Sequence, residues 1–134
     1  YRFNDTAGSM AKDSMFNAAA VVRRMTGKEL SDYDVNINFV GGGNIDGPSA
    51  GCAITTALIS AITGKPVRQD MALTGEISIQ GQVKPVGGVF EKAYGARQAG
   101  MKGIIIPKEN AHDIPERHLG LDIHYAVTID DVLN

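Results

Sequence analysis

Apolar and polar positions alternate with two different periods along the chain, and each period predicts a different element. Apolar side chains recur at helical spacing between Met10 and Met25, which predicts a helix packed on one side. Between residues 35 and 40, apolar side chains alternate with asparagines, which predicts a strand with one polar face. The segment Cys52–Ile62 is apolar almost throughout, so we expect the helix Pro48–Thr63 to be central and the most buried. Gly64 is placed to end that helix.

The second half of the chain predicts short strands separated by helices. Met71–Val86 has the pattern of two strands forming a hairpin, with a break at Gly75, and Val89–Ala99 has that of a helix. Gly103–Ile106 is short and wholly apolar, which is typical of a buried parallel strand, and Ile123–Val127 predicts another strand. Strands that alternate with helices, together with one hairpin, predict a compact α+β fold of two layers, with helices packed against a mixed sheet.

Composition and charge narrow the class of protein. The chain has 134 residues, of which 43% are hydrophobic and 21% charged, which suits one globular domain. A net charge of -2 gives no basic footprint for nucleic acid or an anionic membrane. One cysteine excludes an internal disulfide and fits a reducing compartment, so we expect the cytoplasm. The opening Tyr1-Arg2-Phe3 reads like the middle of a strand, so we expect a fragment of a longer protein.

The first candidate for chemistry is a serine in the turn Asp46-Gly47-Pro48-Ser49-Ala50-Gly51, which joins the predicted strand to the apolar helix. A serine at a helix start is most often a cap. In this turn Pro48 and the flanking glycines would expose the hydroxyl, and the helix would hold it rigidly. The backbone N–H groups of Ser49 and Ala50 are then candidates for stabilising an oxyanion. Ser49 is therefore either a cap or a nucleophile.

A nucleophilic serine needs a base, and the candidate is a lysine. The three histidines lie late in the chain and share no motif. On a helical layout, Lys92 falls on the side of small apolar residues that includes Ala93 and Ala96. Arg97 also falls within that arc, so a long basic side chain that reaches out to solvent is the alternative interpretation. Burial would favour the neutral amine that a base requires, and the hydroxyl of Thr74 would hold it in position.

Several motifs of the chain resemble, in the same order, those of the proteolytic domain of the Lon proteases. The first is the Asp46–Gly51 turn itself. The later ones are Pro66-Val67-Arg68-Gln69-Asp70, Thr74-Gly75-Glu76, Pro85-Val86-Gly87-Gly88, Glu91-Lys92, Ala99-Gly100 and Ile106-Pro107-Lys108-Glu109-Asn110. The resemblance covers nearly the whole chain, from about Ala7 to Leu133. Any one motif would be a weak signal, whereas their common order is a strong one.

This resemblance implies a serine endopeptidase with a Ser-Lys dyad. By the resemblance, Ser49 is the nucleophile, Lys92 the general base and Thr74 the residue that supports the lysine. Asp46 corresponds to an acidic residue that shapes the site or blocks it in inactive forms. The implied fold is that of the Lon proteolytic domain, which is like domain 2 of ribosomal protein S5. Many relatives carry histidine on the strand where this chain has Asn36 and Asn38, so those positions receive no catalytic role.

The family also implies an assembly and a substrate. Its members form six-membered rings of identical subunits and degrade unfolded or damaged proteins, which an ATPase module upstream delivers. We therefore expect residues 1–134 to be one Lon-like proteolytic domain that lacks its first strands and that module. No cofactor or metal is expected in this domain, and ATP and magnesium are expected only in the ATPase module. No P-loop motif occurs in the chain.

A scaffold without protease activity and a small-molecule kinase are the two alternative functions. A non-proteolytic Lon-like domain, of the kind attached to some DNA-repair ATPases, serves as a scaffold and lacks the dyad, whereas both Ser49 and Lys92 are present here. A small-molecule kinase of related fold would use Gly41-Gly42-Gly43 as a phosphate cradle. Asp46 falls where that motif needs its third glycine, and its charge would repel phosphate. A turn between strand and helix accounts better for the glycines.

Overall fold

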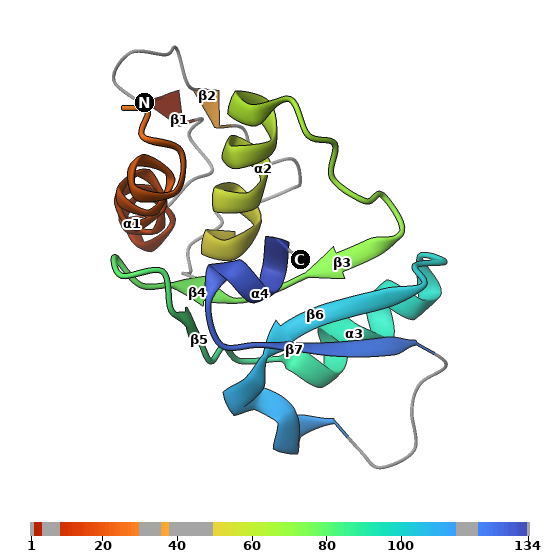
Figure 1. Ribbon diagram of the computed structural model, residues 1–134. Coiled ribbons are helices and arrows are strands. Elements are labelled where there is room, and N and C mark those ends of the chain that lie inside the picture. The colour runs from red at the N-terminus through yellow and green to blue at the C-terminus, as the bar shows by residue number, and fades with distance from the viewer. Residues whose placement is uncertain (1, 4–8, 30–35, 38–49, 115–120, 134) are drawn as a thin grey trace.

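A three-stranded parallel sheet lies at the centre of the lower half of the molecule in Figure 1. The structure is a computed structural model that describes residues 2–3, 9–29, 36–37, 50–114 and 121–133. The sheet has the order β3-β6-β7, in which β6 (Gly103–Pro107) pairs with β3 (Met71–Leu73) on one side and β7 (Asp122–Ala126) on the other. The prediction of a buried parallel strand over Gly103–Ile106 is thereby confirmed.

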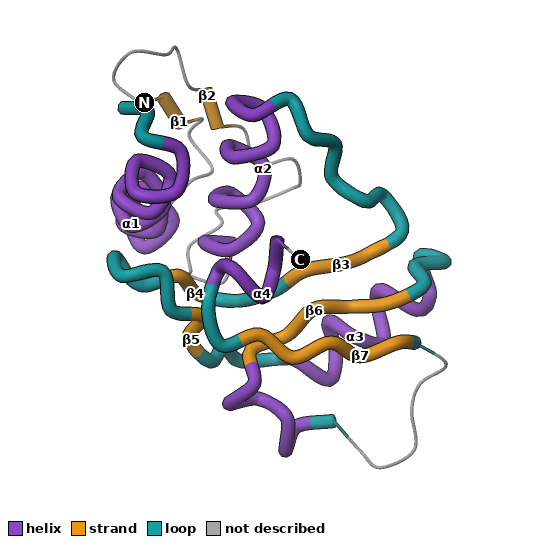
Figure 2. The backbone as a smooth tube through the Cα atoms, in the orientation of Figure 1, coloured by secondary structure: helices purple, strands orange, loops and turns teal. Residues whose placement is uncertain are grey.

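Helices cover both faces of this sheet. Alternate side chains of β6 point to opposite faces and pack against the helices on each side. Ile104 and Ile106 pack with α3 (Val89–Gln98) in one hydrophobic cluster. Ile105 packs against a second cluster, to which α1 (Ser9–Thr26), α2 (Gly51–Thr63) and α4 (Ile129–Leu133) contribute. Figures 1 and 2 show α3 on the side of the sheet away from these three helices. The coarse prediction of an α+β fold is confirmed. The predicted two-layer arrangement is not, because helices lie on both faces of this sheet.

The segment between β3 and α3 differs in detail from the predicted hairpin. Met71–Val86 forms three short strands instead of two. β3 pairs with β6, whereas β4 (Glu76–Ile77) and β5 (Val83–Lys84) pair with each other. The break falls at Gly75, as predicted. A Cβ atom on Gly75 would lie 3.0 Å from both Cys52 Sγ and Val83 Cγ1, so the backbone can pass here only without a side chain.

The remaining strands form a small sheet of their own, and a short helix follows β6. Strand β1 (Arg2–Phe3) pairs in parallel with β2 (Asn36–Ile37), within the segment predicted to be a strand. The segment after β6 forms a 3-10 helix, η3 (Lys108–Asp113). None of the helices in the described ranges has the length and apolar character needed to cross a membrane.

Helix α2 is central but more exposed than its composition predicts. It ends at Thr63, where Gly64 adopts the left-handed conformation with φ of 74°, as its position predicts. Its buried residues are Gly51, Cys52, Thr55 and Ile59. The others are half-buried or exposed, and one face of the helix lines an open groove that continues towards β3 and α4. The expectation that this is the most buried helix is therefore wrong, since α1 buries Ser14, Met15, Ala18, Val21 and Val22.

Candidate active site

Lys92 lies in the first turn of α3, at the edge of the buried face of that helix. Its backbone N–H donates to the carbonyl of Gly88 at 3.0 Å. Gly88 has φ of 68°, a conformation that favours glycine, and it turns the chain from the preceding loop into the helix. Ala93 and Ala96 are buried against the sheet, whereas the Lys92 side chain is half-buried. Arg97, which falls within the same arc of the helix, is exposed. The alternative interpretation, a long basic side chain that reaches out to solvent, therefore applies to Arg97.

Thr74 supplies a fixed partner for the Lys92 amine. It follows β3 directly and is only 6% exposed. Its backbone N–H donates to the carbonyl of Ile105 at 3.1 Å, so the residue continues the pairing of β3 with β6. The Lys92 Nζ donates to Thr74 Oγ1 at 3.3 Å. The structure thus brings together two of the residues that the sequence proposed for one site, although they are 18 positions apart.

The start of α2 packs against the same segment of chain. The N–H of Cys52 donates to the carbonyl of Gly75 at 3.1 Å, and its thiol donates to the carbonyl of Glu76 at 3.7 Å. A Cβ on Gly51 would lie 2.8 Å from Ile77 Cγ2, so this first turn of α2 sits directly on β4. The residues that follow the proposed serine are therefore held against the loop that carries Thr74.

Cys52 does not compete as a nucleophile at this position. Its side chain is fully buried, and burial raises the pKa of the thiol to about 12. Because the thiolate is the reactive form of cysteine, this thiol is inert near neutral pH. Cys52 is a small residue of the core, in the cluster that includes Val21 and Ile77.

Ser49 and Asp46 lie outside the described residues, as does the proposed oxyanion N–H of Ser49. Ala50, the other proposed oxyanion donor, is described. It is half-buried and occupies the N-cap position of α2, the position at which the cap interpretation needs a serine. Of the predicted site residues, the structure therefore describes Ala50, Thr74 and Lys92. Thr74 belongs to the segment 74–76, which forms hydrogen bonds with Cys52 of α2 and Lys92 of α3.

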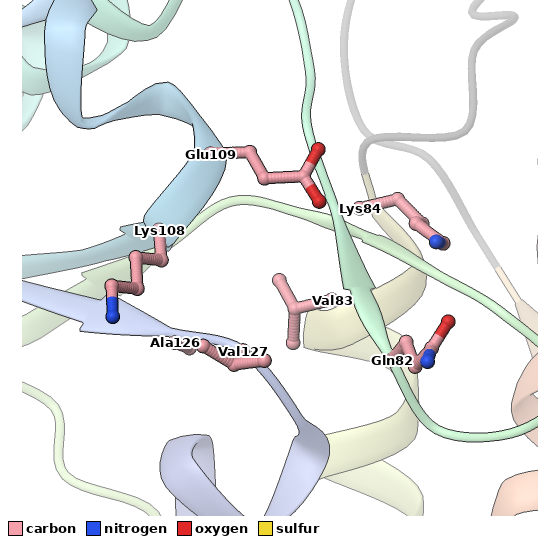
Figure 3. A pocket seen from close by; sticks show the side chains of 7 residues that line it. All are labelled: Gln82, Val83, Lys84, Lys108, Glu109, Ala126 and Val127. Atoms are coloured by element: carbon pink, nitrogen blue, oxygen red, sulfur yellow. The ribbon is translucent and has the colours of Figure 1, made fainter.

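A separate cavity lies on the side of β5 and β7. It has a volume of about 410 Å³ and is lined by residues of β5, the start of η3 and the end of β7 (Figure 3). Its charged groups are Lys84, Lys108 and Glu109. Neither Thr74 nor Lys92 lines it. The sequence assigned no chemistry to these residues, and the cavity is distinct from the Lys92 site.

Asn110 is a buried polar residue near the site for which the sequence predicted no role. It is 4% exposed and forms hydrogen bonds with both the N–H and the carbonyl of Val86. Both residues belong to the motifs of the resemblance. However, a bond between a side chain and a backbone 24 residues away produces no periodicity in the sequence. The one available signal was the presence of an asparagine three positions after the end of a buried strand.

Known proteins similar to the chain are proteases. Lon protease 2 of Bacillus subtilis (strain 168) is 48% identical over 126 residues, which are 94% of this chain and 23% of the relative. An archaeal Lon protease of Thermococcus kodakarensis is 38% identical over 130 residues, or 94% of this chain and 20% of the relative. Lon protease of Haemophilus influenzae is 45% identical over 142 residues, with 98% and 18% covered.

A family model identifies the chain more narrowly than the names of these proteases do. The model of the family described as Lon protease (S16) C-terminal proteolytic domain matches residues 5–134. The chain belongs to this family. The resemblance seen in the ordered motifs is confirmed, and with it the assignment to a protease domain. The chain spans about a fifth of the length of the curated relatives it matches.

Proposed function

We propose that the chain is the proteolytic part of a serine endopeptidase that cleaves unfolded or damaged proteins with a Ser49–Lys92 dyad. The observation that carries the proposal is the contact of Lys92 Nζ with Thr74 Oγ1 at 3.3 Å. Thr74 adjoins Gly75, whose carbonyl accepts the N–H of Cys52 at 3.1 Å. Since Cys52 is only three positions after Ser49, the lysine and the serine turn are linked through one short segment.

The reaction is acyl transfer in two halves. Neutral Lys92 takes the proton from the Ser49 hydroxyl while Oγ attacks the carbonyl carbon of the peptide bond. The N–H groups of Ser49 and Ala50 donate to the oxyanion that forms. Lys92 then gives its proton to the leaving amine, and the C–N bond breaks to leave an acyl-enzyme. Water, deprotonated by Lys92, attacks the ester carbonyl, and the bond from the acyl carbon to Ser49 Oγ breaks to release the acid. Lys92 returns the proton to Oγ, which restores the hydroxyl and the neutral amine.

Thr74 would act by orienting the base. A neutral amine has two hydrogens and one lone pair, so directing one hydrogen to Thr74 Oγ1 restricts its rotation. The lone pair then remains available for the serine proton. Asp46 is proposed to shape the entrance, and in an inactive form to pair with Lys92 and so block the base. The substrate would bind extended, as an additional strand beside the site.

The wider setting is proposed from the family. The domain would adopt the full Lon proteolytic fold, like that of domain 2 of ribosomal protein S5. It would follow an ATPase module in the longer protein, act in a six-membered ring in the cytoplasm, and receive substrates through ATP hydrolysis. ATP and magnesium would bind in that module, and the proteolytic reaction itself would need no cofactor.

Cleavage of casein by the full-length protein tests the dyad. Ser49→Ala and Lys92→Met should each abolish cleavage in the presence of ATP, since one removes the nucleophile and the other the base. Ser60→Ala is the matched control, because Ser60 lies on α2, whose sequence follows the serine turn, and its hydroxyl donates to the carbonyl of Lys65. Cleavage that persists in Ser49→Ala would exclude the dyad. A wild-type protein that binds partners but cuts nothing would favour the scaffold alternative.

A further inference from the structure

Asn110 gives Val86 the hydrogen bonds that a neighbouring strand would give. Its Oδ1 accepts from the N–H of Val86 at 2.9 Å, and its Nδ2 donates to the carbonyl of the same residue at 2.9 Å. The second Nδ2 hydrogen is directed to Asp113 Oδ2 at 2.8 Å. These three bonds fix which end of the amide is oxygen and which is nitrogen. An ionised carboxylate at this position could accept from the N–H of Val86 but could not donate to its carbonyl.

Val86 is the anchor of the loop that leads into α3. Its side chain is half-buried and packs against the cluster on the α3 side of the sheet. Two glycines follow it, and the carbonyl of the second, Gly88, accepts the N–H of Lys92 at 3.0 Å. Since these glycines give the chain conformational freedom, the position of the first turn of α3 depends on a fixed point just before them. Asn110 provides that fixed point.

The other partner of the lysine is tied to the same piece of chain. The N–H of Thr74 donates to the carbonyl of Ile105 at 3.1 Å, and Ile105 lies on the strand that continues into η3. One continuous segment, 105–110, therefore holds Thr74 through its backbone and the start of α3 through the Asn110 side chain. A shift of either tether would change the distance from Lys92 Nζ to Thr74 Oγ1.

We propose that Asn110 is a positioning residue of the protease reaction, which acts on Lys92 through Val86 and the loop before α3. This inference rests on the proposed function, because it assumes that Lys92 is the base. The side-chain hydrogen bonds of Asn110 go to Val86 and Asp113 and not to Lys92, and in the proposed reaction Asn110 does not contact the substrate. Its effect should therefore fall on kcat rather than on KM. A misplacement of about 1 Å can reduce a rate by about 10²-fold.

The test compares Asn110→Asp with Asp113→Asn in the full-length protein. Asn110→Asp keeps the shape, but an ionised carboxylate cannot donate to the carbonyl of Val86 and lies beside the carboxylate of Asp113. We expect kcat for a fluorogenic peptide to fall by about 10²-fold, with KM within about twofold of wild type. Asp113→Asn keeps an acceptor for Nδ2 and both bonds to Val86, so its kcat should stay near wild type.

Labelling of Ser49 by a fluorophosphonate gives a second readout, since its rate depends on activation of the serine by the base. It should slow in parallel with kcat. Asn110→Ala removes the pair without adding a charge and serves if Asn110→Asp does not fold. Unchanged kcat in a folded Asn110 variant overturns the positioning role and leaves the dyad intact. A loss of kcat that only follows the loss of folded protein, measured by near-UV circular dichroism, also overturns it. Retained cleavage in Ser49→Ala overturns the proposed function itself.

Discussion

Removal of the Thr74 hydroxyl is the most direct perturbation of the lysine. Thr74→Val replaces the hydroxyl by a methyl group of similar size and leaves the backbone bond to Ile105 in place. The change removes the acceptor that lies 3.3 Å from Lys92 Nζ. A hydrogen bond of this kind contributes about 0.5–1.5 kcal/mol net. If that energy holds the amine in its reactive orientation, kcat should fall about two- to tenfold.

The assay is steady-state cleavage of a fluorogenic peptide by the full-length protein. Thr74→Ser is the matched control, because it keeps the hydroxyl and loses only the methyl group. KM should be unchanged in both variants, since Thr74 is 6% exposed and is not expected to contact substrate. Equal kcat values for Thr74→Val, Thr74→Ser and wild type would refute the orienting role. A fall in Thr74→Ser as large as that in Thr74→Val would assign the effect to packing instead of the hydroxyl.

Three further predictions concern stability and reactivity. Gly51→Ala should destabilise the domain by about 1–3 kcal/mol, because the new Cβ would lie 2.8 Å from Ile77 Cγ2, whereas Gly95→Ala meets nothing within 4 Å and should be neutral or stabilising in urea unfolding. The backbone N–H groups of Val127 and Thr128 lower the pKa of Asp131 below its ordinary value of 3.8. This group therefore stabilises the fold at pH 7 and loses that contribution as pH falls through the lowered value, so the unfolding midpoints of Asp131→Asn and wild type should differ at pH 7 and converge in strong acid. Cys52 should react with a thiol reagent at pH 8 only after denaturant is added, since burial raises its pKa to about 12; rapid labelling of the native protein would contradict its buried position.

Local sequence patterns predicted most helices and strands, because helix ends and buried strands depend on residues that are close together in the sequence. Gly64 and Gly100 follow the apolar runs of α2 and α3, and both adopt positive φ, as helix-ending glycines do. The apolar run Gly103–Ile106 packs against hydrophobic clusters on both faces because helices cover both sides of the sheet. The partner of β3 was not predictable in the same way. β6 lies about thirty residues later, and nothing in Met71–Leu73 distinguishes that partner from β4.

The site divides along the same line. Helical spacing placed Lys92 beside the small apolar side chains, and the ordered motifs pointed to Thr74, whose contact with the lysine is present. The pair of Asn110 with Val86 was missed, because its two bonds join a side chain to a distant backbone. For Ser49 and Asp46 the sequence remains the only source, since both lie outside the described residues. Their roles therefore stay predictions.

The segment Thr74–Glu76 explains how residues so far apart in sequence can act together. It accepts the N–H of Cys52 from α2, donates to Ile105 of β6 and provides the oxygen for Lys92 of α3. Gly75 has no space for a side chain, because a Cβ would lie 3.0 Å from Cys52 Sγ. The helix after the serine and the helix with the lysine are thus coupled through one closely packed piece of backbone. Gly75→Ala should therefore disturb both the first turn of α2 and the contact of Lys92 with Thr74, and steady-state kcat for the fluorogenic peptide should fall.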